Sequence, residues 1–166
     1  MAGMRMRRLG ASALGAALVV ALTGCGITIP TDPEGTLDDV TGGVLEVGIT
    51  HNPPHTDTTG THPTGTETEL VASFAETIDA RVEWRRGSEQ ELVQLLEIGE
   101  LDLVVGGFSE ETPWSAHVAV TRPYGQAVLA DGSTSGLVML APMGENAFLS
   151  ALERHLDAAM APEGQS

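Results

Sequence analysis

The chain has 166 residues, a formal net charge of −15 and a hydrophobic fraction of 42%, which suits one compact domain and is short for two ordinary ones. All 23 acidic residues follow Cys25, whereas three of the eight basic residues precede it. Such a charge excludes nucleic acid and an anionic membrane surface as partners. Cys25 is the single cysteine, so the chain cannot form an internal disulfide.

Residues 1–24 have the pattern of a secretory signal peptide. Three arginines precede an apolar run from Leu9 to Leu22, which is shorter than the roughly 18 residues typical of a membrane-spanning helix. The run ends in "LTGC", which resembles the lipobox of bacterial lipoproteins, where the cysteine thiol receives a diacylglycerol before cleavage. We therefore expect Cys25 to be the lipid anchor that holds the chain at the extracytoplasmic face of the cell membrane.

The segment 25–43 is rich in Pro, Gly, Thr and Asp and has little apolar periodicity, which predicts a flexible tether after the lipidated cysteine. Beyond it, residues 44–160 carry the apolar patterns of a folded lobe. The last residues, 161–166, are expected to form a disordered tail.

Strand and helix patterns alternate along the first part of this lobe. Apolar runs predict strands and 3.6-residue periodicity predicts helices, in the order strand 44–50, helix 67–78, strand 80–84, helix 87–100 and strand 101–107. Ser88 and Glu91 form a capping box at the start of the second helix. This order predicts an α/β fold, a single doubly wound lobe with a mostly parallel sheet and helices on both faces.

The remainder of the lobe carries weaker patterns. Residues 117–124 are expected to be extended, 126–136 to form a loop and 137–142 to form a further strand. Residues 145–160 place apolar side chains on one face of a closing helix.

Five pieces of the sequence carry a resemblance to a known family. They are "LEVGITHNPP", "GTETELVASFAETIDARVEW", "SEQELVQLLEIGELDLVVGGFSEETPW", "VTRPY" and "GENAFLSALERHL". In this order they resemble the amino-acid class of bacterial extracellular solute-binding proteins, family 3. Family members hold their ligand between two α/β lobes joined by a hinge. Here only "GQAVLADGSTSG" separates the first-lobe pattern from the returning strand and helix, so the resemblance implies lobe one alone.

The resemblance implies the substrate-binding component of an amino-acid-type ABC transporter. As a single lobe, the chain would present a small polar solute or dock to a membrane transporter or sensor protein. Two residues depart from the family pattern. Trp114 stands where members usually carry the arginine that clamps the ligand's α-carboxylate, and His55 replaces the aromatic after the first Pro-Pro. An indole N–H cannot replace a bidentate guanidinium, so we expect free amino acids to bind no better than about millimolar.

The loops after the first and third strands should meet at the carboxyl edge of the sheet, where α/β folds collect ligands. Their candidate ligand-binding residues offer hydrogen bonds or apolar faces. Phe108 and Trp114 can alternatively be packing residues, or exposed aromatics that dock a partner in place of the missing lobe. The candidates are Asn52, His55, Phe108, Ser109, Thr112 and Trp114.

An alternative function is a metal-handling accessory lipoprotein that uses the loop from 51 to 62. Zinc accepts imidazole and carboxylate ligands, which His51, His55 and His62 could supply with Asp57 as a fourth. Their spacing in a Pro/Gly-rich loop matches no compact metal motif, and the loop would lose entropy on converging. We therefore expect a solvated loop or cleft rim without a metal.

The sequence contains no pattern typical of an enzyme. It lacks a Gly-rich phosphate loop, and no Ser-His-Asp or Cys-His grouping follows from its spacing. Glu67 and Glu69 open a helix, where carboxylates complement the helix dipole. We expect no catalysis and no cofactor.

Overall fold

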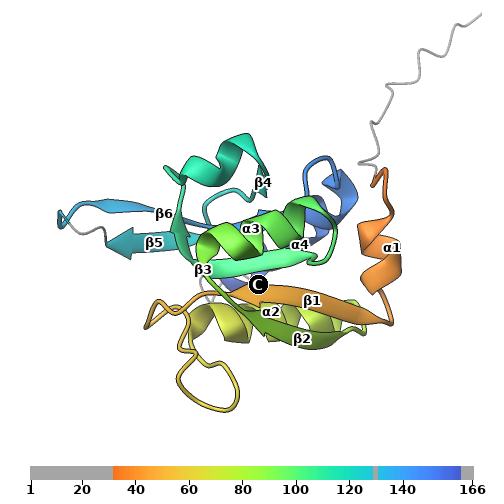
Figure 1. Cartoon of the computed structure of the whole chain (residues 1–166), viewed down its shortest axis with the longest axis horizontal. Coiled ribbons are helices and arrows are strands. Elements are labelled where there is room, and N and C mark those ends of the chain that lie inside the picture. Colours follow the sequence, from red (N-terminus) through yellow and green to blue (C-terminus); the bar gives the residue numbers. More distant parts are fainter. Residues whose placement is uncertain (1–31, 129–130, 162–166) are drawn as a thin grey trace, which may run out of the picture.

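The computed structural model describes residues 32–128 and 131–161. The expected signal peptide, Cys25 and residues 162–166 lie outside them. The described chain forms one sheet flanked by helices (Figure 1). Its elements are α1 (Thr36–Val40), β1 (Val44–Ile49), α2 (Thr66–Thr77), β2 (Arg81–Arg86), α3 (Glu89–Glu97), β3 (Leu103–Ser109), the 3₁₀ turn η1 (Pro113–Ala116), β4 (Ala119–Val120), β5 (Gly125–Val128), β6 (Thr134–Ala141) and α4 (Asn146–Ala159).

The sheet is open and has the strand order β2-β1-β3-β6-β4, with β5 also paired to β6. β1 lies parallel to both β2 and β3. β6 runs antiparallel to β3, and β4 and β5 run antiparallel to β6 along its other edge. Within the described chain, β6 is thus the one strand that opposes the common direction, and the mostly parallel sheet is confirmed.

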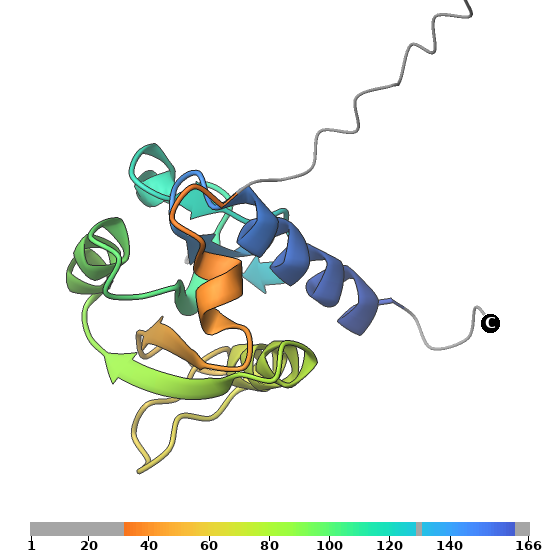
Figure 2. The same ribbon diagram turned by 90° about the vertical axis from the view of Figure 1, so that its right-hand side faces the viewer.

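Helices cover both faces of the sheet, as Figure 2 shows from the side. On one face, α2 and α4 pack over a core that includes Phe74, Phe148 and the inward side chains of β1. On the other face, α3 packs over a second core that includes Leu92, Leu96 and Phe108. The single doubly wound α/β lobe is therefore confirmed. In the part of the chain that the structure describes, no helix has the length and apolar character that crossing a membrane requires.

Residues 32–43 belong to the lobe, so the predicted tether is wrong for this part of segment 25–43. The Asp32 carboxylate accepts hydrogen bonds from the N–H groups of Ala147 and Phe148 at the start of α4. In return, the Glu145 carboxylate accepts two backbone N–H groups at the start of α1. Each carboxylate satisfies N–H groups that a helix leaves unpaired. Local composition could not reveal this, since the partners lie at least 109 residues apart.

The segment 126–136 was expected to be a loop, but it contains most of a β-hairpin. β5 pairs with the beginning of β6, from Gly125 opposite Leu137 to Val128 opposite Thr134. Such short strands, rich in Gly, Ser and Thr, lack the apolar alternation that predicts a strand. The hairpin stands where the family resemblance places the crossing to a second lobe.

Candidate functional site

A hollow of about 490 Å³ lies at the carboxyl edge of the parallel strands. We call it the sheet-edge hollow, and the segment from Thr50 to Gly65 the histidine loop. The histidine loop, Gly107 of β3 and three residues of β5 line it. The lining residues are Asn52, Pro53, Pro54, His55, Gly107, Gln126, Ala127 and Val128. Of the predicted site residues, Asn52 and His55 are the two that meet here.

Backbone and side-chain hydrogen bonds fix the near wall of the sheet-edge hollow. The Asn52 side-chain amide donates to the Gly106 carbonyl over 2.8 Å, which ties the histidine loop to β3. The Asn52 N–H donates to the Thr56 carbonyl over 2.8 Å, and the His55 N–H returns to the Asn52 carbonyl over 3.0 Å. The loop therefore forms a compact turn at this end.

Position 107 requires glycine, both because a side chain would not fit and because of its backbone conformation. Its φ is +67°, a region that side-chain-bearing residues rarely adopt. A Cβ at this position would lie 2.9 Å from His55 Cδ2 and still closer to the Asn52 side-chain amide. Glycine thus allows the histidine loop to approach β3.

Glu67 lies beneath the point where the histidine loop approaches β3, and its hydrogen bonds join three segments of the chain. Its side chain is fully buried, and one carboxylate oxygen accepts the Gly107 N–H over 2.8 Å. The other oxygen accepts the hydroxyl of Tyr124, which precedes β5. The Glu67 N–H also donates to the His55 carbonyl over 3.0 Å. The predicted role at the helix dipole therefore misses its main function, which is to hold the histidine loop, β3 and β5 together.

Burial sets the ionisation of this pair. Removal from water raises the pKa of Glu67 above its ordinary value, and the hydrogen bonds from Tyr124 and Gly107 oppose that rise without cancelling it. Burial beside the same carboxylate also raises the pKa of the Tyr124 hydroxyl. The phenol therefore remains a hydrogen-bond donor under ordinary conditions.

His55 retains free hydrogen-bonding capacity at the hollow. Its Nδ1 atom is buried and has no hydrogen-bond partner among the residues that the structure describes. Buried polar atoms of this kind are normally paired. The described residues thus leave the His55 Nδ1 atom unsatisfied at the wall of the hollow.

The other four predicted site residues lie away from the hollow. Phe108 is 5% exposed and belongs to the core beneath α3, so the alternative of a packing residue applies and an exposed aromatic does not. Period-two alternation explains this, because it places Gly107 and Phe108 on opposite faces of β3. Ser109 is half-buried beyond Phe108. Thr112 is buried and caps η1, where its hydroxyl accepts the Trp114 N–H.

Trp114 packs at the margin of the same core. Its indole N–H donates to the Glu89 carboxylate over 3.0 Å, and its ring meets His117 edge-on with centroids 6.5 Å apart. The indole is therefore engaged within the lobe, although the side chain is only half-buried.

The histidines of the loop do not converge. His51 Nδ1 lies 3.6 Å from an Asp57 carboxylate oxygen and accepts the Thr58 N–H. His55 lines the sheet-edge hollow, whereas His62 lies against β2. Within residues 32–128 and 131–161, no group of three or more His, Cys, Asp or Glu side chains is placed to hold a metal ion.

Comparisons with known proteins agree with this architecture. The sequence profile of the bacterial extracellular solute-binding proteins, family 3, matches residues 45–164. No curated protein matches the sequence.

Among solved structures, a mutant of the arginine-bound form of domain 1 from TmArgBP of T. maritima has a TM-score of 0.66 at 18% identity, covering 74% of this chain and 97% of that one. The arginine-specific periplasmic binding protein of Salmonella typhimurium has a TM-score of 0.63 at 11% identity, with 72% and 94% covered. The unliganded L-cystine solute receptor of Neisseria gonorrhoeae has a TM-score of 0.61 at 12% identity, with 77% and 90% covered.

At these identities the structural matches establish the fold, and the profile match over most of the chain establishes the family. The open, mostly parallel sheet with helices on both faces matches a single lobe. The chain belongs to the bacterial extracellular solute-binding proteins, family 3.

Proposed function

We propose that this chain is an extracytoplasmic, lipid-anchored solute-binding module whose single lobe holds a small polar solute of the amino-acid type. The observation that carries the proposal is the sheet-edge hollow, where Asn52, His55 and Gly107 meet β5 beyond the parallel strands. Ligands of open α/β sheets collect at this position. Within the hollow, amide, imidazole and backbone groups can form hydrogen bonds with a solute.

A single lobe is sufficient for such a role in at least one relative. Domain 1 of TmArgBP is described in an arginine-bound form, which supports binding of a solute without an enclosing second lobe. Among the residues that the structure describes, no arginine lines the sheet-edge hollow, so a carboxylate lacks the bidentate guanidinium contact there. We expect dissociation constants no tighter than about millimolar.

The lipid anchor at Cys25 would keep the lobe beside a membrane transporter or sensor, which is the partner that the family implies. The proposed role is binding without catalysis or a cofactor. No observation favours the metal-handling alternative, because His62 lies apart from His55.

A nuclear magnetic resonance titration of the chain from Gly26 onwards tests this function. The twenty common amino acids are added singly, up to about 50 mM, far above a millimolar dissociation constant. At least one should shift the amide signals of Asn52, Gly107 and Gln126 in a saturable manner. The absence of such shifts throughout the panel would contradict the proposal. In a separate titration with zinc, shifts of His51, His55 and His62 together would favour the metal role.

A further inference from the structure

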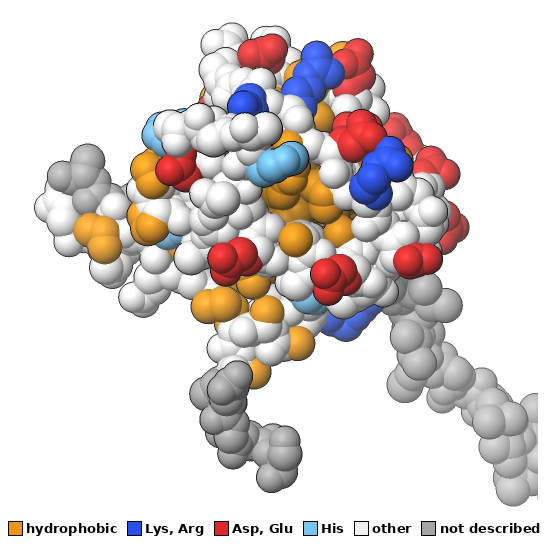
Figure 3. Space-filling model, turned by 90° about the horizontal axis from the view of Figure 1, so that it is seen from below, with side chains coloured by type: hydrophobic (Ala, Val, Ile, Leu, Met, Phe, Trp, Pro, Cys, Tyr) orange, Lys and Arg blue, Asp and Glu red, His pale blue; other side chains and the backbone are white. Residues whose placement is uncertain are grey.

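A second hollow, of about 650 Å³, lies between the outer strand β2 and the far end of the histidine loop. Thr61, His62 and Pro63 form its loop side, and β2 from Val82 to Arg86 forms the other. Seen from below, the space-filling view shows an apolar area with a histidine at its rim and both basic and acidic side chains around it (Figure 3). We call it the β2 hollow.

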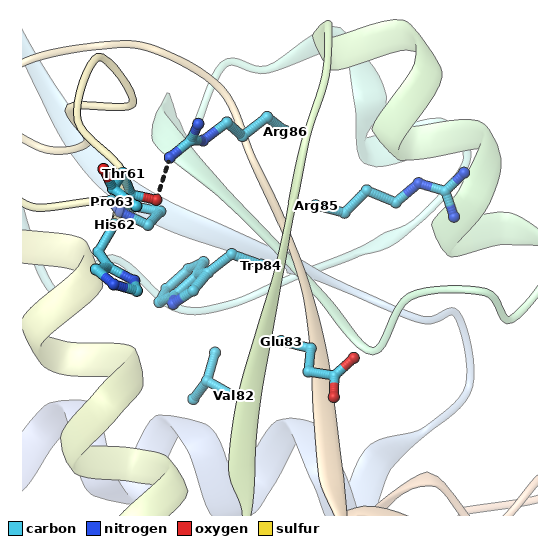
Figure 4. A pocket seen from close by; sticks show the side chains of 8 residues that line it. All are labelled: Thr61, His62, Pro63, Val82, Glu83, Trp84, Arg85 and Arg86. Atoms are coloured by element: carbon cyan, nitrogen blue, oxygen red, sulfur yellow. Dashed lines mark hydrogen bonds between the residues drawn. The ribbon is translucent and has the colours of Figure 1, made fainter.

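Side chains of β2 alternate between the two faces of the strand, as Figure 4 shows. Trp84 and Val82 point toward the histidine loop, where both also pack against the main core. The His62 imidazole lies next to the Trp84 indole. Glu83 and Arg85 point to the opposite side, and Arg85 there pairs with Glu100 over 3.2 Å. Trp84 and Val82 thus form an aromatic and apolar floor, whereas Glu83 lines the β2 hollow with its carboxylate directed to the opposite side of the strand.

Arg86 places a positive charge at one end of this floor. Its guanidinium donates to the Gly60 and Thr61 carbonyls over 2.6 and 2.9 Å, which fixes the group against the loop (Figure 4). These acceptors are neutral, and no carboxylate of the described residues pairs with Arg86, whereas Arg81 and Arg85 each have one. Since only one guanidinium nitrogen is used, the others keep N–H donors for a ligand.

We propose that the β2 hollow binds small aromatic carboxylates, with the ring stacked on Trp84 and the carboxylate directed to Arg86 and His62. An indole and an aromatic ring stack favourably in an offset arrangement, and a guanidinium favours a carboxylate over a neutral amide. The β2 hollow shares no lining residue with the sheet-edge hollow, so this inference is independent of the proposed function.

Tryptophan fluorescence tests the inference directly. The chain has two tryptophans, so a Trp114→Phe background makes Trp84 the sole reporter. Phenylacetate, phenylacetamide and phenethylamine present the same ring with a negative, neutral or positive group. Phenylacetate should change the emission with a dissociation constant of about millimolar, phenylacetamide should bind several-fold more weakly, and phenethylamine most weakly.

Two arginines on opposite faces of β2 provide a matched pair of variants. Arg86→Gln should weaken phenylacetate binding by about tenfold and leave phenylacetamide unaffected. Arg81→Gln removes an equal charge from a residue of β2 that does not line the hollow, and it should change neither by more than about twofold.

Three results would overturn the inference. The first is equal binding of the three probes, or no response of Trp84 to phenylacetate. The second is an equal loss in the Arg81 and Arg86 variants, which would indicate a general charge effect. The third is loss of phenylacetate binding on Gly107→Ala, which would place the ligand in the sheet-edge hollow. If Arg86→Gln does not fold, the comparison of phenylacetate, phenylacetamide and phenethylamine in the Trp114→Phe background still tests the inference.

Discussion

Replacement of Glu67 should separate its role as a hydrogen-bond acceptor from its role as a charge. In Glu67→Ala, the Gly107 N–H and the Tyr124 hydroxyl lose their shared acceptor inside the lobe. A buried donor without a partner costs about 1–3 kcal/mol, so the two together should lower the free energy of unfolding by about 2–6 kcal/mol. Glu67→Gln keeps one carbonyl for Gly107 and offers its amide to the Tyr124 oxygen, so it should cost much less.

The two variants should also differ in their response to pH. Burial raises the pKa of Glu67 in the folded lobe, so its contribution to stability is fully present below the ordinary carboxyl pKa and is lost as pH rises through the folded value. Glu67→Gln cannot ionise. Its stability relative to the parent should therefore increase as pH rises from about 4.5, the ordinary carboxyl range.

Urea unfolding of the parent, Glu67→Ala, Glu67→Gln and Tyr124→Phe at several pH values provides the measurement. The double variant Glu67→Ala/Tyr124→Phe completes a cycle in which the two residues should couple by about 1–2 kcal/mol. A cost below about 1 kcal/mol for Glu67→Ala, or a Glu67→Gln difference that does not change with pH, would refute the reasoning.

Four further predictions concern the rest of the chain. Phe108→Ala should lower the unfolding free energy by about 3–5 kcal/mol in urea, because Phe108 is buried beneath α3; a near-neutral effect would restore it as a site residue. Asp32→Ala should cost about 1–2 kcal/mol through lost capping of α4, and a neutral result would return this segment to the tether. Cys25→Ser should move the protein from the detergent phase to the aqueous phase, whereas unchanged partitioning would exclude lipidation there. A strong chelator should leave cooperative melting unchanged, and loss of melting restored by zinc would show a structural metal.

Local periodicity was sufficient to predict the strands and helices in the regular part of the lobe. The apolar runs around Val47 and Val104 became buried strands, and Ser88 caps α3 by accepting the Glu91 N–H. These features depend on residues within a few positions of one another, so a single sequence carries them.

The features that hold the candidate site together depend on distant residues. Glu67 acts on Gly107, 40 residues away, and Tyr124, 57 residues away. One local signal was available: Glu67 lies four and seven positions before Val71 and Phe74, on the buried stripe of α2. Gly107 gave a weaker signal, because a glycine that ends an apolar strand does not by itself indicate which side chain approaches it.

The misassignment of Phe108 and Trp114 as site residues has a related physical cause. A loop that follows a strand can be placed at a sheet edge from topology, but the face on which each side chain lies depends on strand register. Alternation along β3 places Val104 and Phe108 on the α3 side, in the same core that Trp114 packs against. Gly107 instead faces Asn52 and His55 of the histidine loop.

Solute binding at the sheet-edge hollow is tested most directly by a pair of glycine variants. Gly107→Ala places a methyl group against Asn52 and His55, whereas Gly99→Ala imposes a similar positive φ, +73° against +67°, with no atom within 4 Å. The two are titrated calorimetrically with the amino acid that gives the largest shifts in the panel. We predict that Gly99→Ala retains the parent dissociation constant while Gly107→Ala, still folded, loses binding by at least about tenfold. Equal binding by a folded Gly107→Ala variant would contradict the assignment of this hollow as the solute site.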